Sequence, residues 1–243
     1  MQGLSLPEYV RLIEGYPAMW LFDRYVVIGD LHIGYEVSAK DKGLHLPLQV
    51  NRYISRLKEL KDITEAQELI ILGDVKDSVL MPSFEELNEL LKVFEELSKI
   101  FRITIVQGNH DAYLDKILQK YASFSSASGL VISEKGAKVG LAHGHARPSD
   151  ECLEADVLVL AHMHFYIRYN STKYPVWLIG RKGKQTLILM PPFNDLLSGF
   201  YVEDVNAVVP FTNYPLYQMD VVTLDGYYLG KLRELRGVFE ESD

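Results

Sequence analysis

Histidine, aspartate and asparagine residues gather immediately after short apolar runs in this chain. Six of the seven histidines follow this pattern, and only His45 lies outside it. The residues concerned are Asp30, His32, Asp74, Asn109, His110, His143, His145, His162 and His164. One such residue alone is most simply an ordinary turn residue. Five ordered clusters of them instead predict a functional site.

Three of these clusters hold two polar residues separated by one position, namely Asp30/His32, His143/His145 and His162/His164. In extended backbone, residues two apart point to the same face, so each pair can present both side chains to one cavity. Imidazole and carboxylate groups together suit first-row divalent metal ions. Because the chain has a single cysteine, Cys152, it can form neither a cysteine-type structural zinc site nor an internal disulfide. The pattern therefore predicts a site for divalent metal.

The clusters follow strand-length runs rich in Val, Ile and Leu, at residues 24–30, 68–74, 101–109, 137–144 and 155–162. Open α/β sheets bind ligands beyond the carboxyl ends of their strands, which is where these clusters lie. Helices are predicted between the runs, over residues 48–61, 83–100 and 111–121. The apolar face predicted for 83–100 consists of Phe84, Leu87, Leu91 and Phe94. This alternation predicts a sheet with crossover helices.

After Asp156 the pattern changes to closely spaced strands with little helix, at 174–181, 184–191, 204–211 and 216–226. These strands predict a second, mostly antiparallel sheet. The fold class expected from the whole pattern is an α/β sandwich of two sheets flanked by helices. Since no linker, repeat or low-complexity stretch interrupts the chain, residues 1–243 are expected to form a single domain.

Composition narrows the class of protein. With 48% hydrophobic residues among 243, the chain is not disordered throughout. Its 25 basic and 33 acidic residues give a net charge of −8, so bulk charge does not hold it to nucleic acid. The amino-terminal segment lacks the basic region of a signal peptide, and no apolar run approaches the length of a membrane span. We therefore expect a soluble, cytoplasmic protein without a membrane partner.

The five clusters resemble, in order and spacing, the motifs of the calcineurin-like metallophosphoesterases. They read GDLHIG (29–34), GDVKD (73–77), GNHD (108–111), HGH (143–145) and AHMH (161–164). The stretches LHIGYEVSAKDKGLHLPLQ, HGHARP and MPPFNDLLSGF are similar to the smaller ICC-like group, which includes the DNA-ligase-associated phosphoesterases. The resemblance implies a four-layer αββα fold.

The same resemblance implies a dinuclear metal centre. One ion would be held by Asp30, His32, Asp74 and His164, and the other by Asp74 as a bridge with Asn109, His143 and His162. Manganese is the expected metal, with zinc, iron(II) or nickel as alternatives. The implied reaction is in-line attack of a bridging hydroxide on phosphorus, because two ions can clamp both the attacking and the leaving oxygen. His110 would be the catalytic histidine that donates a proton to the leaving group, and Asp77 the carboxylate that orients it.

Three departures from the family pattern bear on the backbone and the substrate. Ala161 replaces the usual glycine before His162, which is acceptable if Ala161 has a negative φ. Ser78 and Gln107 stand where the family's protein phosphatases carry phosphate-binding arginines. A phosphomonoester dianion gains most from such arginines, so their absence favours a phosphodiester. The expected substrate is a nucleotide or a nucleic-acid end.

Other functions stay open at this point. A phosphomonoesterase, a nuclease component that acts with DNA-repair partner proteins, and a metal-holding scaffold without turnover are the alternatives. A scaffold has no use for a proton donor, so His110 and Asp77 favour an enzyme. Lys76 could touch substrate, although a solvated side chain is the simpler interpretation. The oligomeric state is not indicated.

Overall fold

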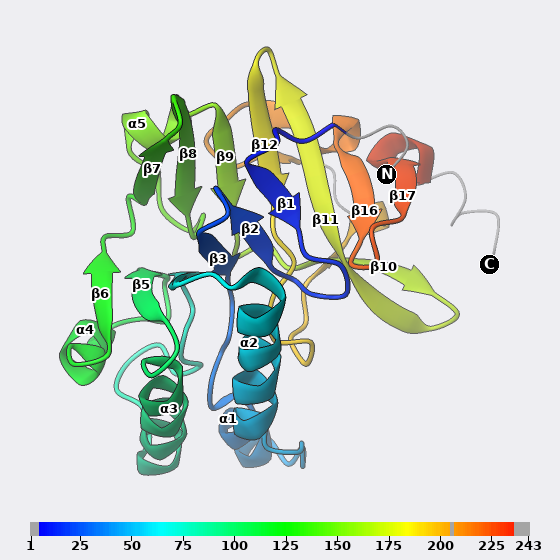
Figure 1. Ribbon diagram of the computed structural model, residues 1–243. Coiled ribbons are helices and arrows are strands. Elements are labelled where there is room, and N and C mark those ends of the chain that lie inside the picture. The colour runs from blue at the N-terminus through cyan, green and yellow to red at the C-terminus, as the bar shows by residue number, and fades with distance from the viewer. Residues whose placement is uncertain (1–4, 205–206, 236–243) are drawn as a thin grey trace.

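Two β-sheets pack face to face in the computed structural model, which describes residues 5–204 and 207–235 (Figure 1). The first sheet has the order β1-β2-β3-β4-β5-β6. Its strands are β1 (Val10–Leu12), β2 (Met19–Leu21), β3 (Tyr25–Ile28), β4 (Glu68–Leu72), β5 (Arg102–Val106) and β6 (Ala122–Ser125). Strands β3 to β6 are parallel to one another, so their carboxyl ends meet at one edge.

The second sheet is mixed and has the order β13-β10-β11-β12-β9-β8-β7, with β16 on β11 and β17 on β16. Its strands are β7 (Leu130–Glu134), β8 (Ala137–Ala142), β9 (Val157–Leu160), β10 (Phe165–Tyr169), β11 (Thr172–Lys182), β12 (Gln185–Leu189), β13 (Phe200–Tyr201), β16 (Asp220–Thr223) and β17 (Tyr228–Lys231). A separate two-stranded ribbon pairs β14 (Val208–Val209) with β15 (Tyr214–Pro215). The second sheet thus begins before Asp156, because β8 pairs with β9 rather than with the first sheet.

The helices lie mostly beside the first sheet (Figure 1). They are α1 (Tyr35–Asp41), α2 (Val50–Thr64), α3 (Phe84–Leu97), α4 (Leu114–Leu118) and α5 (Asp150–Leu153), with 3₁₀ turns at Val202–Asp204 and Leu216–Gln218. The expected α/β sandwich is confirmed, and the outer face of the second sheet is covered by α5, the 3₁₀ turns and the segments around them. None of the helices in the described ranges is both long and apolar enough to cross a membrane.

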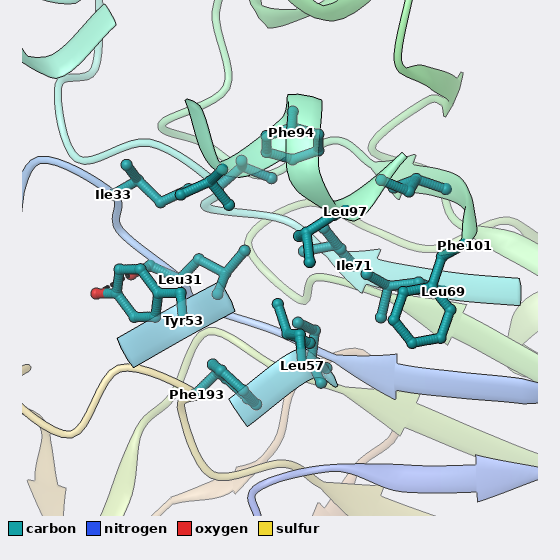
Figure 2. Close-up of a cluster of buried hydrophobic side chains, with 14 of the residues drawn as sticks. Leu31, Ile33, Tyr53, Leu57, Leu69, Ile71, Phe94, Leu97, Phe101 and Phe193 are labelled. Carbon is teal, nitrogen blue, oxygen red and sulfur yellow. Dashed lines mark hydrogen bonds between the residues drawn. The ribbon is translucent and has the colours of Figure 1, made fainter. Parts of the chain in front are cut away.

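The alternation of side chains along each strand separates the core into layers. In β4, Leu69 and Ile71 face α2 and α3, whereas Ile70 and Leu72 face the second sheet. Figure 2 shows the helix-side cluster, to which α2 contributes Leu57 and α3 contributes Phe94. All of these side chains are almost completely buried. The strands that carry the polar clusters are therefore anchored on both faces.

The apolar face predicted for α3 is confirmed at Phe94 and Leu91, which pack in the core, but not at Phe84. In α3 the buried residues are Glu86, Leu90, Val93, Phe94 and Leu97, and Phe84 is 80% exposed. The face is rotated because the carboxylate of Glu86 is directed inward, where it accepts hydrogen bonds from the backbone of Asp77 and Ser78. The sequence also predicted no helix at α1. Of the strand predicted at 204–211 the structure has only β14, and residues 205–206 lie outside the described ranges.

Candidate metal centre

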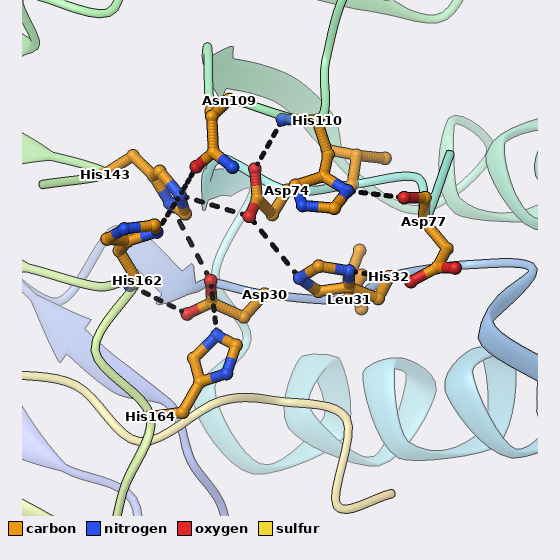
Figure 3. Close-up of polar contacts among 12 residues, drawn as sticks. Asp30, Leu31, His32, Asp74, Asp77, Asn109, His110, His143, His162 and His164 are labelled. Carbon is orange, nitrogen blue, oxygen red and sulfur yellow. Dashed lines mark hydrogen bonds and ion pairs between the residues drawn. The ribbon is translucent and has the colours of Figure 1, made fainter. Parts of the chain in front are cut away.

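The polar clusters meet at the carboxyl ends of β3, β4, β5, β8 and β9 (Figure 3). The pairing of β3 with β4 continues past the strand ends into the loops that carry the first two clusters. The backbone N–H of Asp30 donates to Gly73 (3.1 Å), and that of His32 donates to Asp74 (2.9 Å). These backbone hydrogen bonds hold the two loops together, so that the carboxylates of Asp30 and Asp74 lie side by side (Figure 3).

Three groups of side chains that could hold a metal ion result, and two of them contain only predicted ligands. Of these two, one consists of Asp30, His32 and His164, and the other of Asp74, His143 and His162. The carboxylate of Asp74 faces both groups, since its Oδ2 lies 3.4 Å from His32 Nε2 and 3.3 Å from His143 Nε2. Asn109 Oδ1 lies 3.1 Å from His143 Nε2 and so joins the second group.

Each ring that presents Nε2 to the site is fixed through its other nitrogen. His32 Nδ1 donates to Asp77 Oδ1 (3.1 Å), His143 Nδ1 to the Leu72 carbonyl (2.8 Å) and His164 Nδ1 to the Ser198 carbonyl (3.1 Å). With Nδ1–H engaged, the Nε2 lone pair of each neutral ring is directed to the centre. Partners of this kind set the tautomer and orientation of metal-binding histidines.

The centre has unpaired polar atoms at the positions where a metal would bind. Asp30 Oδ1, His32 Nε2 and His164 Nε2 are buried and have no hydrogen-bond partner, although His164 Nε2 approaches Asp30 Oδ1 to 3.0 Å. Buried polar atoms are rarely left unpaired in proteins because each costs about 1–3 kcal/mol. Carboxylate and imidazole donors suit divalent transition metals, so the residues fit such an ion.

Mutual electrostatic attraction shifts the pKa values of these groups strongly. Burial would raise the pKa of Asp74, but His143 and His32 hold it well below the ordinary value of 3.8. Burial would likewise lower the pKa of His32, yet the carboxylates of Asp74 and Asp77 raise it to about 10. The pKa of His143 rises to about 9 because Asp74 and Asp30 outweigh its burial. In the metal-free protein, protons therefore occupy the centre at neutral pH.

We expect the stabilisation by metal to grow as the pH rises from 6.5 to 9. The raised pKa values of His32 and His143 stabilise the metal-free fold below pH 6.5, and this contribution is lost as the pH rises through about 9 and 10. Metal binding needs the neutral rings and therefore becomes stronger over the same range. Thermal unfolding of metal-free and zinc-loaded protein at several pH values measures both trends. A metal-induced increase in Tm that shrinks with rising pH would contradict this prediction.

The backbone of the centre is held in an unusual conformation. The left-handed φ values are 56° at Asp30, 43° at His32, 49° at Asp74, 72° at His162 and 42° at His164. Such conformations cost non-glycine residues of the order of 1 kcal/mol and persist only where the surroundings enforce them. Ala161 is not among the residues with positive φ, so alanine can replace the family's usual glycine there without backbone strain.

Close packing of the loops admits no side chain at Gly108. A Cβ built there would lie 2.3 Å from both the backbone nitrogen and the Oδ1 of Asp74. We expect Gly108→Ala to displace the Asp74 carboxylate and to lower turnover by about 100-fold, the typical cost of a misplacement near 1 Å. Gly136→Ala is the control for backbone strain away from the centre, since Gly136 has open space around it but a φ of 79° that alanine adopts only at a cost. If Gly108→Ala and Gly136→Ala are equally active and equally stable, displacement of the Asp74 carboxylate does not affect turnover, which contradicts the prediction.

His110 is held differently from the expected arrangement. Its backbone N–H donates to Asp74 Oδ1 (2.9 Å), and its Nδ1 donates to the main-chain carbonyl of Asp77. The Asp77 carboxylate instead accepts from His32. Figure 3 shows the carbonyl of Asp77 directed toward the ring of His110, while its carboxylate lies toward His32.

Several groups that support the centre are not indicated by any sequence pattern. Asp111 is 1% exposed and accepts from the backbone N–H groups of Val75 (2.9 Å) and Gly108 (2.8 Å), tying the β4 and β5 loops together. The segment after β12 also reaches the centre, since the backbone of Asn194 donates to the Asp30 carbonyl (3.2 Å). Motifs GNHD and MPPFNDLLSGF contain these residues, but nothing in their composition reveals backbone contacts.

A family model described as calcineurin-like phosphoesterase matches residues 24–189. The chain therefore belongs to the calcineurin-like phosphoesterase family. Among solved structures, nuclease MPE of Pseudomonas putida is similar to it, with 19% identity, a TM-score of 0.61 and coverage of 88% of this chain and 92% of that chain. YfcE, a phosphoesterase from E. coli, has 16% identity and a TM-score of 0.44 over 85% of this chain and 97% of that chain. A comparison with curated protein sequences finds no match.

Family membership identifies the chain as a phosphoester hydrolase that uses divalent metal ions, in agreement with the Asp and His groups at the centre. The likeness to nuclease MPE concerns the fold. The narrower similarity to the ICC-like group stays a prediction.

Proposed function

We propose that the protein is a phosphodiesterase that uses two divalent metal ions at this centre. The observation that carries the proposal is the Asp74 carboxylate, whose Oδ2 lies within 3.4 Å of His32 and within 3.3 Å of His143, on the two sides of the site. A carboxylate in that position is suited to bridge two ions. The donor set, the unpaired buried atoms and the fixed ring orientations all support this interpretation.

The proposed ligands of one ion are Asp30, His32, Asp74 and His164, and those of the other are Asp74, Asn109, His143 and His162. When bound, two such ions lower the pKa of water to near 7 and stabilise the charge that develops on a phosphoryl group. Manganese is the metal proposed, with zinc, iron(II) and nickel as the alternatives to test. Oxygen and imidazole donors are compatible with each of them.

His110 is proposed as the proton donor to the leaving oxygen. Since its Nδ1 donates to the Asp77 carbonyl, Nε2 is the nitrogen that can carry a transferable proton. The link from its backbone to Asp74 places it at the metal centre. Protonation of the leaving group by such a residue contributes about 10²–10⁴ in rate.

The residues near the expected phosphate position favour a diester substrate. Ser78 and Gln107 stand where arginines would bind the terminal oxygens of a monoester. The Ser78 hydroxyl is also engaged, since it donates to Glu86 Oε1 (2.9 Å). Because each hydrogen bond to a charged group contributes about 1.5–3 kcal/mol, a monoester dianion would lose more than a diester monoanion by this absence.

Hydrolysis of bis-p-nitrophenyl phosphate against p-nitrophenyl phosphate tests this proposal. Metal-free protein would be reloaded with Mn²⁺, Zn²⁺, Fe²⁺ or Ni²⁺, and we expect kcat/KM for the diester to exceed that for the monoester by about tenfold or more. A preference for the monoester would favour a phosphomonoesterase. Two bound ions without turnover of either ester would favour a scaffold. The internucleotide linkages at nucleic-acid ends are the first natural diesters to test, since MPE, which has a similar fold, is described as a nuclease.

A further inference from the structure

Lys76 is a buried ammonium group beside the centre, not a solvated or substrate-facing side chain. The residue is 0% exposed and lies on the loop between Asp74 and Asp77. Its backbone forms an isolated parallel bridge with Ile33. Complete burial of a lysine is costly unless its charge and its donors are satisfied, so this position needs a physical reason.

All three donors of the Lys76 ammonium group are used by two loops, the one that follows β4 and the one that follows β5. Nζ donates to the main-chain carbonyls of Ser78, Leu80 (2.7 Å) and His110. An ammonium group has three donors, so these three bonds complete its capacity. Burial lowers the pKa of Lys76, and the negative charges of Asp111, Glu86, Asp74 and Asp77 offset this effect only in part. Lys76 is therefore a fixed link between the β4 loop and the β5 loop.

Lys76 contacts the backbone of His110, whereas Asp77 contacts its ring. The ring donates through Nδ1 to the Asp77 carbonyl, while the carbonyl of His110 itself accepts from Lys76. His110 thus has two attachments to the segment 76–77, one through its carbonyl and one through its ring, in addition to its N–H bond to Asp74. Rotation of this peptide would carry the imidazole away from the centre.

We propose that Lys76 is a positioning residue that holds His110 in the orientation needed to protonate the leaving oxygen. This inference rests on the proposed function and deepens it. The loops have other anchors, because Asp111 holds the backbone of Val75 and Gly108. Glu86 in turn holds the backbone of Asp77 and Ser78. Removal of the ammonium group is therefore expected to misplace His110 while leaving the fold and the metal ligands in place.

The test uses Lys76→Met, which keeps an unbranched apolar stem and removes the ammonium group with its donors. The matched control is Lys61→Met, because Lys61 donates to the Ala66 carbonyl (2.7 Å) next to the amino-terminal end of β4, away from the centre. Two diesters are compared, bis-p-nitrophenyl phosphate with a good leaving group and diphenyl phosphate with a poorer one. Proton donation matters more for the poorer leaving group.

We expect Lys76→Met to lower kcat about 100-fold on diphenyl phosphate and about tenfold or less on bis-p-nitrophenyl phosphate, with KM and bound metal unchanged. Lys61→Met should behave as wild type. If Lys76→Met does not fold, Lys76→Gln is used instead, since it retains two donors. Its loss of kcat should again be larger on diphenyl phosphate than on bis-p-nitrophenyl phosphate, but both losses should be smaller. Equal losses on both diesters, or loss of metal together with activity, would overturn the inference in favour of a structural role.

A second readout does not depend on turnover. In the zinc-loaded protein, the Nδ1 proton of His110 is expected as a downfield NMR resonance, identified by its absence in His110→Asn. It should persist in Lys61→Met and disappear in Lys76→Met; its persistence there would overturn the inference. If wild type cleaved neither diester, the proposed function would fail while this measurement still decided the role of Lys76.

Discussion

Asp74→Asn is expected to empty the metal centre and to lower turnover by about 10³-fold or more. The substitution removes the carboxylate charge that faces both ligand groups at 3.3 and 3.4 Å. It removes one of the carboxylates that raise the pKa values of the buried rings of His32 and His143. A metal centre contributes several kcal/mol of transition-state stabilisation, and each 1.36 kcal/mol corresponds to about tenfold in rate.

Elemental analysis of the purified variant, together with its rate on bis-p-nitrophenyl phosphate, measures this effect. Asn tolerates the left-handed conformation that Asp74 adopts, so backbone strain does not confound the result. Asp62→Asn, on the exposed surface of α2, is the matched control and should retain wild-type metal and activity. Full metal occupancy in Asp74→Asn would rule out a bridging role for this carboxylate.

His110→Asn is expected to lower turnover by about 10²–10⁴-fold while the bound metal stays unchanged. The proposed role of His110 is proton transfer at Nε2, and its ring contact is with the Asp77 carbonyl rather than with a ligand group that contains Asp30 or His143. The loss should be larger for diphenyl phosphate than for bis-p-nitrophenyl phosphate, because the poorer leaving group needs the proton more.

A competing arrangement makes this experiment informative. His32, Asp77 and His110 also offer ligand atoms within 4.8 Å of one another, so His110 could itself hold an ion. In that case metal content and turnover would fall together in His110→Asn. Asp77→Asn separates the roles further, since its carboxylate orients His32 at 3.1 Å and its carbonyl, which is retained, orients His110. We expect weaker metal binding in that variant, by about 10–100-fold.

The sequence predicted where the polar clusters meet because a change from apolar to polar residue types marks the end of each strand. The apolar runs before Asp30, Asp74 and Asn109 predicted strands, and parallel strands bring their carboxyl ends together. The clusters that terminate those runs contain the proposed ligands, and their division between two ions came from the family resemblance. The assignment of β8 and β9 to a second sheet could not follow from local pattern, since pairing between strands distant in sequence leaves no periodic signal.

Backbone partners explain most of what the sequence could not predict. The carbonyl groups of Leu72, Ser198 and Asp77 orient metal-site histidines, and every residue type has a carbonyl. Amphipathic periodicity likewise identified only part of the buried face of α3, because it treats a buried carboxylate such as Glu86 as solvent-facing. The interpretation of Lys76 as a solvated side chain was wrong because main-chain carbonyls, which no sequence pattern reveals, accept its hydrogen bonds.

The most direct test of the account is a titration of metal-free protein with Mn²⁺ in which bound metal and hydrolysis of bis-p-nitrophenyl phosphate are measured together. We expect turnover to rise with added metal, to reach its maximum at about two ions per chain and to disappear after chelation. Full activity of the metal-free protein, or a maximum at one ion per chain, would contradict a dinuclear centre bridged by Asp74.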